Sequence, residues 1–205
     1  MKINTIKRLN LDEIKQLHKQ YMVNDFPKNE LRPYPMIKHL YNKQQYAVFG
    51  AYSEDKLIAY SCFLLSEKSS LILLDYFAVI PPLRGTGLGS EFIKELPKII
   101  QTHYKHINNI VIECENPNMA ENIQEQETRN RRISFYKKNG AAVSKCGWYA
   151  FGVDYILLAL PVCNKDNIVP NNTTLGEAVY RLYLSGFSIL SKPIAKKNLR
   201  YYSLD

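Results

Sequence analysis

Three glycines stand within five positions, where a strand-like run gives way to a helical one. They are Gly85, Gly87 and Gly89, in the segment Arg84-Gly85-Thr86-Gly87-Leu88-Gly89-Ser90. Glycine permits positive φ angles and lets a ligand come close to backbone amides. The N–H groups in the first turn of a helix have no partner within the helix and carry partial positive charge. The spacing therefore predicts a loop that binds phosphate or pyrophosphate, with Arg84 as an added cation.

Two common phosphate loops do not fit this segment. The P-loop requires Lys and then Ser or Thr after its last glycine, whereas Ser90-Glu91 follow Gly89 here. The dinucleotide fingerprint requires Gly or Ala where this chain has Ser90, and it requires a parallel βαβ unit. A third pattern fits every position: a strand ending in Val-x-Pro, then Arg/Gln-x-x-Gly-x-Gly/Ala. The chain reads Phe77-Ala78-Val79-Ile80-Pro81 and then Arg84 to Gly89.

This third pattern resembles the acetyl-CoA-binding motif of the GNAT N-acetyltransferase superfamily. The order of the expected elements agrees with that family from the first helix through Leu160. The resemblance implies an α/β fold of the α+β type, with a mixed, mainly antiparallel central sheet flanked by helices. We expect this domain over residues 1–161, followed at 162–205 by a helical extension with a basic tail.

The resemblance implies that acetyl-CoA is the cofactor, and no metal is expected. It implies that the CoA pyrophosphate is bound by the backbone amides of Arg84, Gly85, Thr86, Gly87, Leu88, Gly89 and Ser90. The backbone of Phe77, Ala78 and Val79 is expected to pair with pantetheine, as an added strand does. One of these strand amides, at Phe77 or Val79, is expected to polarise the thioester carbonyl.

A second segment, Arg132-Ile133-Ser134-Phe135-Tyr136-Lys137-Lys138-Asn139-Gly140, resembles the family's helix ending in Tyr-x-x-x-Gly. Tyr136 is the candidate general acid, because a departing thiolate needs a proton that a phenol can supply. The alternative is a tyrosine that only packs beside Phe135. The family's usual Asn and Ala, seven and four residues before this Tyr, are here Arg129 and Arg132. Contacts from these arginines to phosphate are the expected replacement.

The general base is an acidic residue on one of two strands. A protonated amine must lose a proton before it can attack a thioester. The candidates are Glu113 and Glu115 on one expected strand and Asp75 on the cofactor strand. Period-two alternation places Glu113 and Glu115 on one face. Glu113 is preferred, with removal of the proton through water as the alternative. For Asp75, a buried structural hydrogen bond is as plausible as catalysis.

The expected elements follow from periodicity and capping. A capping box at Asn10 and Glu13 begins the first helix, and Thr174 to Glu177 resembles another. Pro97 is expected to kink or shorten the glycine-loop helix, and Glu125 and Arg129 form a favourable four-residue pair. We expect helices near 36–41 and 87–104, and another helix that carries acidic residues up to Glu127 and basic residues from Arg129 to Lys138. We also expect an antiparallel meander of strands at 46–52, 57–65 and 71–80, and further strands at 110–115, 148–154 and 155–160.

Composition limits the cellular compartments and the classes of partner that we expect for this protein. The 205 residues carry a net charge of +8, which favours an anionic partner but does not choose among nucleic acid, a membrane surface and a phosphorylated cofactor. No apolar run approaches the length of a membrane span, and the basic N-terminus has no secretory signal. The four widely spaced cysteines predict reduced thiols in a cytoplasmic protein.

The sequence therefore predicts an acetyl-CoA-dependent N-acetyltransferase that acts on a primary amine by direct attack in a ternary complex. One alternative is a CoA-binding module without transfer activity. Another is a nucleic-acid-associated protein that modifies tRNA or a ribosomal protein, which no RNA-reading motif supports. A homodimer through the C-terminal helix is a further expectation. The acceptor, which is a small molecule or a peptide amine, is not determined by the sequence, because a fold does not fix its substrate.

Overall fold

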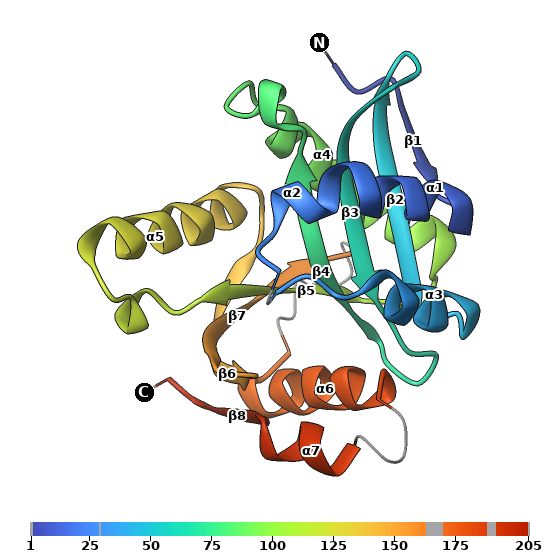
Figure 1. Cartoon of the computed structure of the whole chain (residues 1–205). Coiled ribbons are helices and arrows are strands. Elements are labelled where there is room, and N and C mark those ends of the chain that lie inside the picture. Colours follow the sequence, from blue (N-terminus) through green and yellow to red (C-terminus); the bar gives the residue numbers. More distant parts are fainter. Residues whose placement is uncertain (1, 29, 163–169, 188–191, 205) are drawn as a thin grey trace. The chain divides into compact units, whose positions relative to one another are not determined.

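The computed structural model describes residues 2–28, 30–162, 170–187 and 192–204 (Figure 1). The chain divides into two compact units, Met1–Leu65 with Leu74–Ile93, and Ser66–Leu73 with Lys94–Asp205. Both units combine helices with strands that pair mainly antiparallel, as predicted. The two compact units do not divide at residue 161. The predicted boundary at that residue, between a domain and a C-terminal extension, stays a prediction.

The first unit contains four neighbouring strands and the N-terminal helices. Its elements are β1 (Thr5–Arg8), α1 (Leu11–Leu17), η1 (His18–Met22), α2 (Val23–Asp25), α3 (Tyr34–Asn42), β2 (Tyr46–Ser53), β3 (Lys56–Leu64), β4 (Leu71–Val79) from Leu74 onward, η2 (Pro81–Leu83) and the start of α4 (Leu88–His103). The strands lie in the order β1, β2, β3, β4. β1 was not predicted, because four residues with mostly exposed side chains show no alternation.

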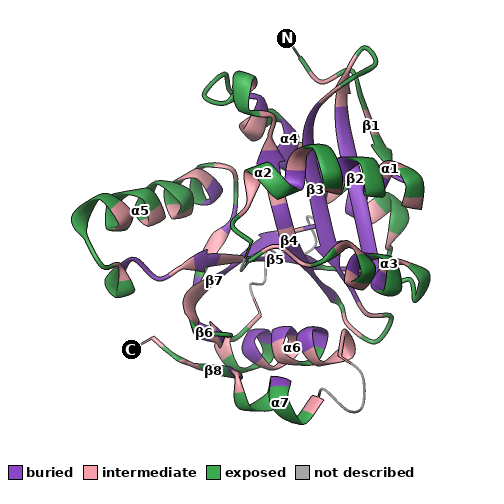
Figure 2. Cartoon of the chain, viewed as in Figure 1, coloured by how far each residue is buried: buried purple, intermediate pink, exposed green. Residues whose placement is uncertain are grey.

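Local sequence explains how the first unit begins and turns. Asn10 caps α1 by accepting from the N–H groups of Asp12 and Glu13, and the Glu13 carboxylate accepts from the N–H of Asn10, so the predicted capping box is confirmed. β2 and β3 pair antiparallel across a tight turn, as the meander requires. Apolar side chains on β2, β3 and β4 form the core of the unit, and these strands appear as long buried segments in Figure 2.

The second unit contains the other strands and the C-terminal helices. Its elements are the first residues of β4, the remainder of α4, β5 (Asn109–Glu115), η3 (Pro117–Met119), α5 (Ile123–Lys138), β6 (Ala142–Ala150), β7 (Val153–Pro161), α6 (Asn172–Ser185), α7 (Lys192–Lys197) and β8 (Leu199–Ser203). The strands lie in the order β5, β7, β6, β8. α4 continues through Pro97 to His103, so this proline does not shorten the helix, and the alternative that it kinks the helix stays a prediction.

The closing strands differ from their predicted ranges. β6 begins at Ala142, and the turn to β7 lies at Phe151 and Gly152, which both have positive φ angles, rather than at Asp154 and Tyr155. The apolar run over residues 155–160 correctly predicts the centre of β7. It does not predict the start, because the strand already includes Val153 and Asp154. Strand pairing with β6, at Ala150 and Val153, decides the boundary.

The C-terminal segment is more regular than predicted. Asn171, not Thr174, caps α6, because its side chain accepts from the N–H of Thr174. The expected basic tail forms α7 and β8, and β8 pairs antiparallel with β6 between residues 199 and 203. α6 lies against β6 and β8 (Figure 1). The extension is therefore part of the second unit's own sheet and helix packing.

Three cysteines are buried and reduced, as predicted: Cys62, Cys114 and Cys146. Cys163 lies outside the described residues. No helix within the described ranges is both long and apolar enough to cross a membrane. Among the same residues, no cluster of three or more His, Cys, Asp or Glu side chains is arranged to hold a metal ion.

Candidate active site

The loop between β4 and α4 has the backbone conformation that its glycines predict. Gly85 and Gly87 have φ angles of +78° and +90°, which side-chain-bearing residues rarely adopt. A Cβ at either position would meet no atom within 4 Å, so the space beside the backbone is open. The hydrogen bonding of α4 begins with a bond from the N–H of Glu91 to the carbonyl of Gly87, so the amides of residues 88–90 lie in the first turn of the helix. This is an anion-binding geometry.

Arg84 holds the loop to the rest of the first unit. Its Nε donates to the carbonyl of Val79 at 3.0 Å, and its Nη2 lies 2.7 Å from Oδ1 of Asp25. The carboxylate of Asp25 is only 2% exposed, and it also accepts from the Tyr60 hydroxyl at 2.7 Å. The N–H of Arg84 donates to Pro81. The Arg84 side chain is still 53% exposed, and its predicted part in binding the cofactor stays a prediction.

The predicted cofactor strand is the end of β4. Burial alternates along it, so Asp75, Phe77 and Val79 share one face, as predicted. The ring of Phe77 stacks on that of Phe92, with centroids 5.5 Å apart and planes at 21°, which joins the strand to α4. Ala78 is buried on the opposite face. Backbone pairing of residues 77–79 with pantetheine stays a prediction.

Asp75 is held by two partners in the first unit. Arg32 donates from Nε to Oδ2 at 2.9 Å and from Nη2 to Oδ1 at 3.0 Å, and the hydroxyl of the fully buried Tyr46 donates to Oδ2 at 2.7 Å. The Asp75 side chain is 6% exposed. A bidentate ion pair and a hydroxyl donor thus satisfy this largely buried carboxylate. The structural interpretation of Asp75 is therefore the better supported one.

We expect Asp75→Asn to lower the free energy of unfolding by about 3 kcal/mol, because it leaves the largely buried Arg32 guanidinium without its carboxylate. Urea unfolding followed by circular dichroism measures the effect. Asp55→Asn, in the exposed turn between β2 and β3, is the control and should change the free energy by less than about 0.5 kcal/mol. Equal effects of the two substitutions would contradict this role for Asp75.

Tyr136 lies near the end of α5 in the second unit. Its side chain is 8% exposed, and its ring meets that of Phe135 edge-on at a centroid distance of 5.1 Å. Burial raises the pKa of Tyr136 well above its usual value, further raised by Cys114 and opposed by the charge of Arg132. The phenol therefore keeps its proton at neutral pH and is a hydrogen-bond donor there. Its predicted role as general acid stays a prediction.

Glu113 and Glu115 share one half-buried face of β5, as predicted, but their partners differ. The hydroxyl of Tyr183 donates to both oxygens of Glu113, at 2.8 and 2.9 Å. Glu115 instead accepts from Nη1 of Arg132 at 2.9 Å and lies 3.7 Å from Nη2 of Arg129.

Arg129 and Arg132 are both paired within the second unit. Arg129 donates to the carbonyl of Asn116 at 2.8 Å and to the Glu125 carboxylate at 2.6 Å, which confirms the predicted four-residue pair on α5. Its side chain is 11% exposed, whereas that of Arg132 is 49% exposed. Arg129 thus ties α5 to the end of β5, and the predicted contacts of both arginines to phosphate stay predictions.

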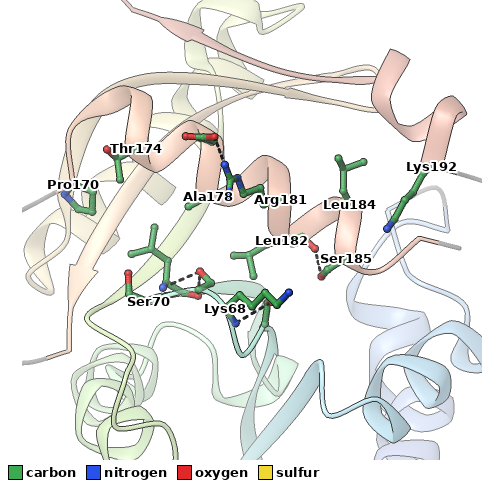
Figure 3. A pocket seen from close by; sticks show the side chains of 14 residues that line it. Lys68, Ser70, Pro170, Thr174, Ala178, Arg181, Leu182, Leu184, Ser185 and Lys192 are labelled. Atoms are coloured by element: carbon green, nitrogen blue, oxygen red, sulfur yellow. Dashed lines mark hydrogen bonds and ion pairs between the residues drawn. The ribbon is translucent and has the colours of Figure 1, made fainter. Parts of the chain in front are cut away.

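The second unit also contains a pocket of about 510 Å³ between the turn after β3 and one side of α6 (Figure 3). Leu71, Ala178 and Leu182 form apolar parts of its wall. Its polar groups are largely bonded already: Arg181 pairs with Glu177 at 2.5 Å, and the Ser69 hydroxyl bonds the backbone of Leu71. None of its fourteen described lining residues is a candidate for the transfer chemistry.

Three site residues were missed by the sequence reasoning. Tyr183, Asp25 and Arg32 each act through a partner at least 43 residues away in sequence, namely Glu113, Arg84 and Asp75. No spacing rule links residues that far apart. A signal for Tyr183 was present only in its position on the buried face of the predicted C-terminal helix.

Comparison with known proteins decides the family. The model of the acetyltransferase (GNAT) family matches residues 11–141, which is more than half of the chain. The chain belongs to the GNAT family. It is an acyltransferase by that membership, and the glycine loop and the Tyr136 helix both lie inside the matched range. No curated protein sequence matches the chain.

Solved structures have the same fold as this GNAT chain. A protein from Bacteroides thetaiotaomicron assigned to the GNAT acetyltransferases aligns with a TM-score of 0.62 and 18% identity, over 80% of this chain and 90% of that one. An N-acetyltransferase from Staphylococcus aureus aligns with a TM-score of 0.56 and 18% identity, over 78% and 98%. The ribosomal-protein-S18-alanine N-acetyltransferase from Escherichia coli aligns with a TM-score of 0.51 and 18% identity, over 81% and 99%. At these identities the likeness shows the fold alone.

Proposed function

We propose that this GNAT chain transfers the acetyl group of acetyl-CoA to a primary amine, by direct attack of the amine in a ternary complex. The observation that carries the proposal is the loop between β4 and α4. Its two glycines with positive φ leave the backbone amides before α4 open to an anionic group. The family membership supplies the reaction class, acetyl transfer.

Two features support acetyl-CoA as the cofactor. The open space beside Gly85 and Gly87 admits a phosphate that a Cβ would obstruct, and the amides of residues 84–90 would hold the pyrophosphate. The backbone of residues 77–79 would hold pantetheine as an added strand. When bound, acetyl-CoA supplies the acetyl group as a thioester. Arg132, with its half-exposed guanidinium, is our proposed phosphate contact from α5.

We assign the general base to Glu113. It accepts a proton from the acceptor amine, which is mostly protonated at neutral pH and cannot attack in that form. Glu113 bonds to a neutral hydroxyl of Tyr183, whereas Glu115 and Asp75 are held by arginines. Removal of the proton through a water molecule is the alternative.

Tyr136 is our proposed general acid. It holds its proton on Oη at neutral pH, because burial raises its pKa, and it would donate to the sulfur that leaves the acetyl group. The neighbouring thiol of Cys114 supports direct attack by the amine. Burial raises the pKa of Cys114 to about 12, so this thiol is not ionised at neutral pH and is a poor nucleophile.

The proposal is tested by CoA release from acetyl-CoA in the presence of a panel of primary amines, read with a thiol reagent. The panel should contain polyamines, aminoglycosides, amino acids and peptides with free N-termini or lysines. Amine-dependent release, with mass spectrometry of the acetylated product, is the expected result. Tight CoA binding without release for any amine would indicate instead the CoA-binding module without transfer activity.

We expect Tyr136→Phe to lower kcat by about 10- to 100-fold at every pH between 6 and 10. The raised pKa of Tyr136 means that its phenol stays protonated across this range, so its loss removes a donor without removing a titration step. Phe135→Leu, which alters the packing beside Tyr136 but removes no hydroxyl, is the control. Unchanged turnover by Tyr136→Phe would remove Tyr136 from the mechanism.

A further inference from the structure

The loop between β4 and α4 is fixed at its start by an ion pair with the N-terminal part of the chain. Nη2 of Arg84 lies 2.7 Å from Oδ1 of Asp25, the last residue of α2, and the two residues are 59 positions apart in sequence. Both belong to the first unit. Arg84 comes directly before Gly85, the first loop residue with a positive φ angle. The ion pair therefore fixes the residue from which the loop departs.

The carboxylate of Asp25 is itself held rigidly. Its side chain is 2% exposed, and its Oδ2 accepts from the hydroxyl of Tyr60 at 2.7 Å. Tyr60 is fully buried on β3, which lies beside α2 in Figure 1. Burial raises the pKa of Tyr60, as does its hydrogen bond to Asp25, so the phenol keeps its proton at neutral pH and stays a donor. Because each carboxylate oxygen has a donor of its own, the plane of the carboxylate is set from two sides.

The guanidinium of Arg84 connects this carboxylate to the end of β4. Its Nε donates to the carbonyl of Val79, the last residue of β4, at 3.0 Å. The turn between the two residues is closed by the N–H of Arg84, which donates to the carbonyl of Pro81 at 3.2 Å. The hydroxyl of Thr86 donates to the carbonyl of Leu83 at 2.7 Å. One planar group thus joins the strand, the turn and α2, and its two bonds fix its orientation.

The other end of the loop is fixed by the start of α4. Leu88, the first residue of the helix, is buried, and the N–H of Glu91 donates to the carbonyl of Gly87. Only residues 85–87 separate this end from Arg84. Glycine has more conformational freedom to lose than any other residue, so an unanchored loop would pay a large entropic cost when it binds a ligand. An anchor at Arg84 lowers that cost, because the loop is ordered before the ligand arrives.

Asp25 also places a negative charge beside a loop with anion-binding geometry. A carboxylate near a phosphate opposes its binding by Coulomb repulsion, and the pair with Arg84 offsets this charge. A favourable effect of Asp25 on the binding of an anion must therefore come from the geometry of the loop. Neutralising Asp25 separates the two effects, because the lost repulsion favours the anion and the lost anchor disfavours it.

We propose that Asp25 is a positioning residue for the cofactor: through Arg84, it holds the loop of residues 85–87 in the conformation that binds the CoA pyrophosphate. This inference rests on the proposed function, because it takes the loop to be the CoA site. It gives the N-terminal helix α2 a part in cofactor binding, although the glycine pattern lies about 60 residues further along the chain.

The test compares Asp25→Asn with Asp75→Asn. Asp75 is a matched control because it is a largely buried carboxylate of the same unit, paired with an arginine and bonded at 2.7 Å to the hydroxyl of a buried strand tyrosine, Tyr46. We expect Asp25→Asn to raise the dissociation constant for CoA about tenfold, although it removes a negative charge, and Asp75→Asn to change it less than twofold. Calorimetric titration measures both. An unchanged or lower constant in Asp25→Asn, or equal rises in the two variants, would overturn the proposal.

A milder pair of variants covers the case in which Asp25→Asn does not fold. Tyr60→Phe removes one donor to Asp25 and keeps the ion pair, whereas Tyr46→Phe removes the corresponding donor to Asp75. We expect Tyr60→Phe to raise the dissociation constant for CoA about threefold and Tyr46→Phe to leave it within about 1.5-fold of the wild type. Equal effects of the two would count against a role for Asp25 in positioning the loop and would overturn it.

A measurement without CoA separates this inference from the proposed function. ¹⁵N relaxation of the Gly85 and Gly87 amides in the free chain should give order parameters of about 0.85 in the wild type and in Asp75→Asn, and below about 0.6 in Asp25→Asn. Unchanged order parameters in Asp25→Asn would overturn the Asp25 proposal even if the wild type binds CoA and transfers acetyl groups. Conversely, a loop that loses order in Asp25→Asn, in a chain whose wild type binds no CoA, would leave the anchor standing and overturn the proposed function.

Discussion

Gly87→Val raises the dissociation constant for CoA at least about 100-fold while the chain stays folded. Gly87 has a φ angle of +90°, which valine does not adopt without strain, so the loop must change its path. The change turns two or more amides away from the pyrophosphate, and each bond to a charged group contributes about 1.5–3 kcal/mol. Calorimetric titration of CoA into the purified variant measures the effect.

The control is Gly152→Val, in the turn between β6 and β7. Gly152 has a φ angle of +98° and, like Gly87, open space beside its Cβ position, so the backbone strain is matched. Both substitutions should cost about 1–2 kcal/mol of stability and lower Tm by about 2–8 °C. Only Gly87→Val should lose CoA. An unaltered affinity in folded Gly87→Val would show that the loop does not bind the cofactor.

Glu113→Gln is expected to lower kcat by about 100-fold or more at neutral pH. The amide keeps the shape of the side chain and can still accept from Tyr183, but it cannot take a proton from the bound amine. The loss should lessen at high pH, where more of the acceptor is already neutral. Initial rates of CoA release between pH 6 and 10, at saturating acceptor, give the profile.

Glu115→Gln provides the comparison on the same face of β5. Its carboxylate bonds to Arg132 and lies near Arg129, so its loss should lower Tm by a few degrees. The kcat should change less than about threefold, and the pH profile should keep its shape. A large loss of kcat in Glu115→Gln, with little change in Glu113→Gln, would move the base to Glu115.

The conformation of the glycine loop was predictable because its information is local. Two glycines at positive φ, a strand before them and a helix after them fall within about twenty consecutive residues, and each follows from residue type. The capping box at Asn10 and the ion pair between Glu125 and Arg129 were predictable for the same reason. All of these depend on contacts within four residues along the chain.

The partners of the charged residues were not predictable in this way. Arg84 and Arg129 were expected to meet phosphate, but Asp25 and Glu125, with backbone carbonyls, occupy their guanidinium groups. Arg84 and Asp25 are 59 residues apart. A cation in a sequence shows only that it needs a counter-charge, and the fold decides which one it meets. The net charge of +8 therefore does not show how many cations are available to an anionic ligand, because some of them are paired within the chain.

Pairing between strands that are distant in sequence also determined the structure of the C-terminal segment, which the residue pattern did not predict. The residues of β8 alternate neither in polarity nor in burial, so the sequence predicts only a basic tail there. The structure shows instead that β8 pairs with β6 over residues 199–203. Such a strand is stabilised by backbone hydrogen bonds to a neighbour, which side-chain patterns do not reveal. The same pairing brings α6 against the sheet, since α6 contacts both β6 and β8.

The sequence by itself determined the family, the conformation of the glycine loop and the face of β5 that carries two candidate bases, because these depend on residue type and short-range periodicity. Only the tertiary structure decided which groups the acidic residues meet. Asp75 and Glu115 are paired with arginines, and Glu113 accepts from the phenol of Tyr183, 70 residues away. The physical reason is that packing brings together residues that are distant in sequence, and a sequence pattern does not show those partners.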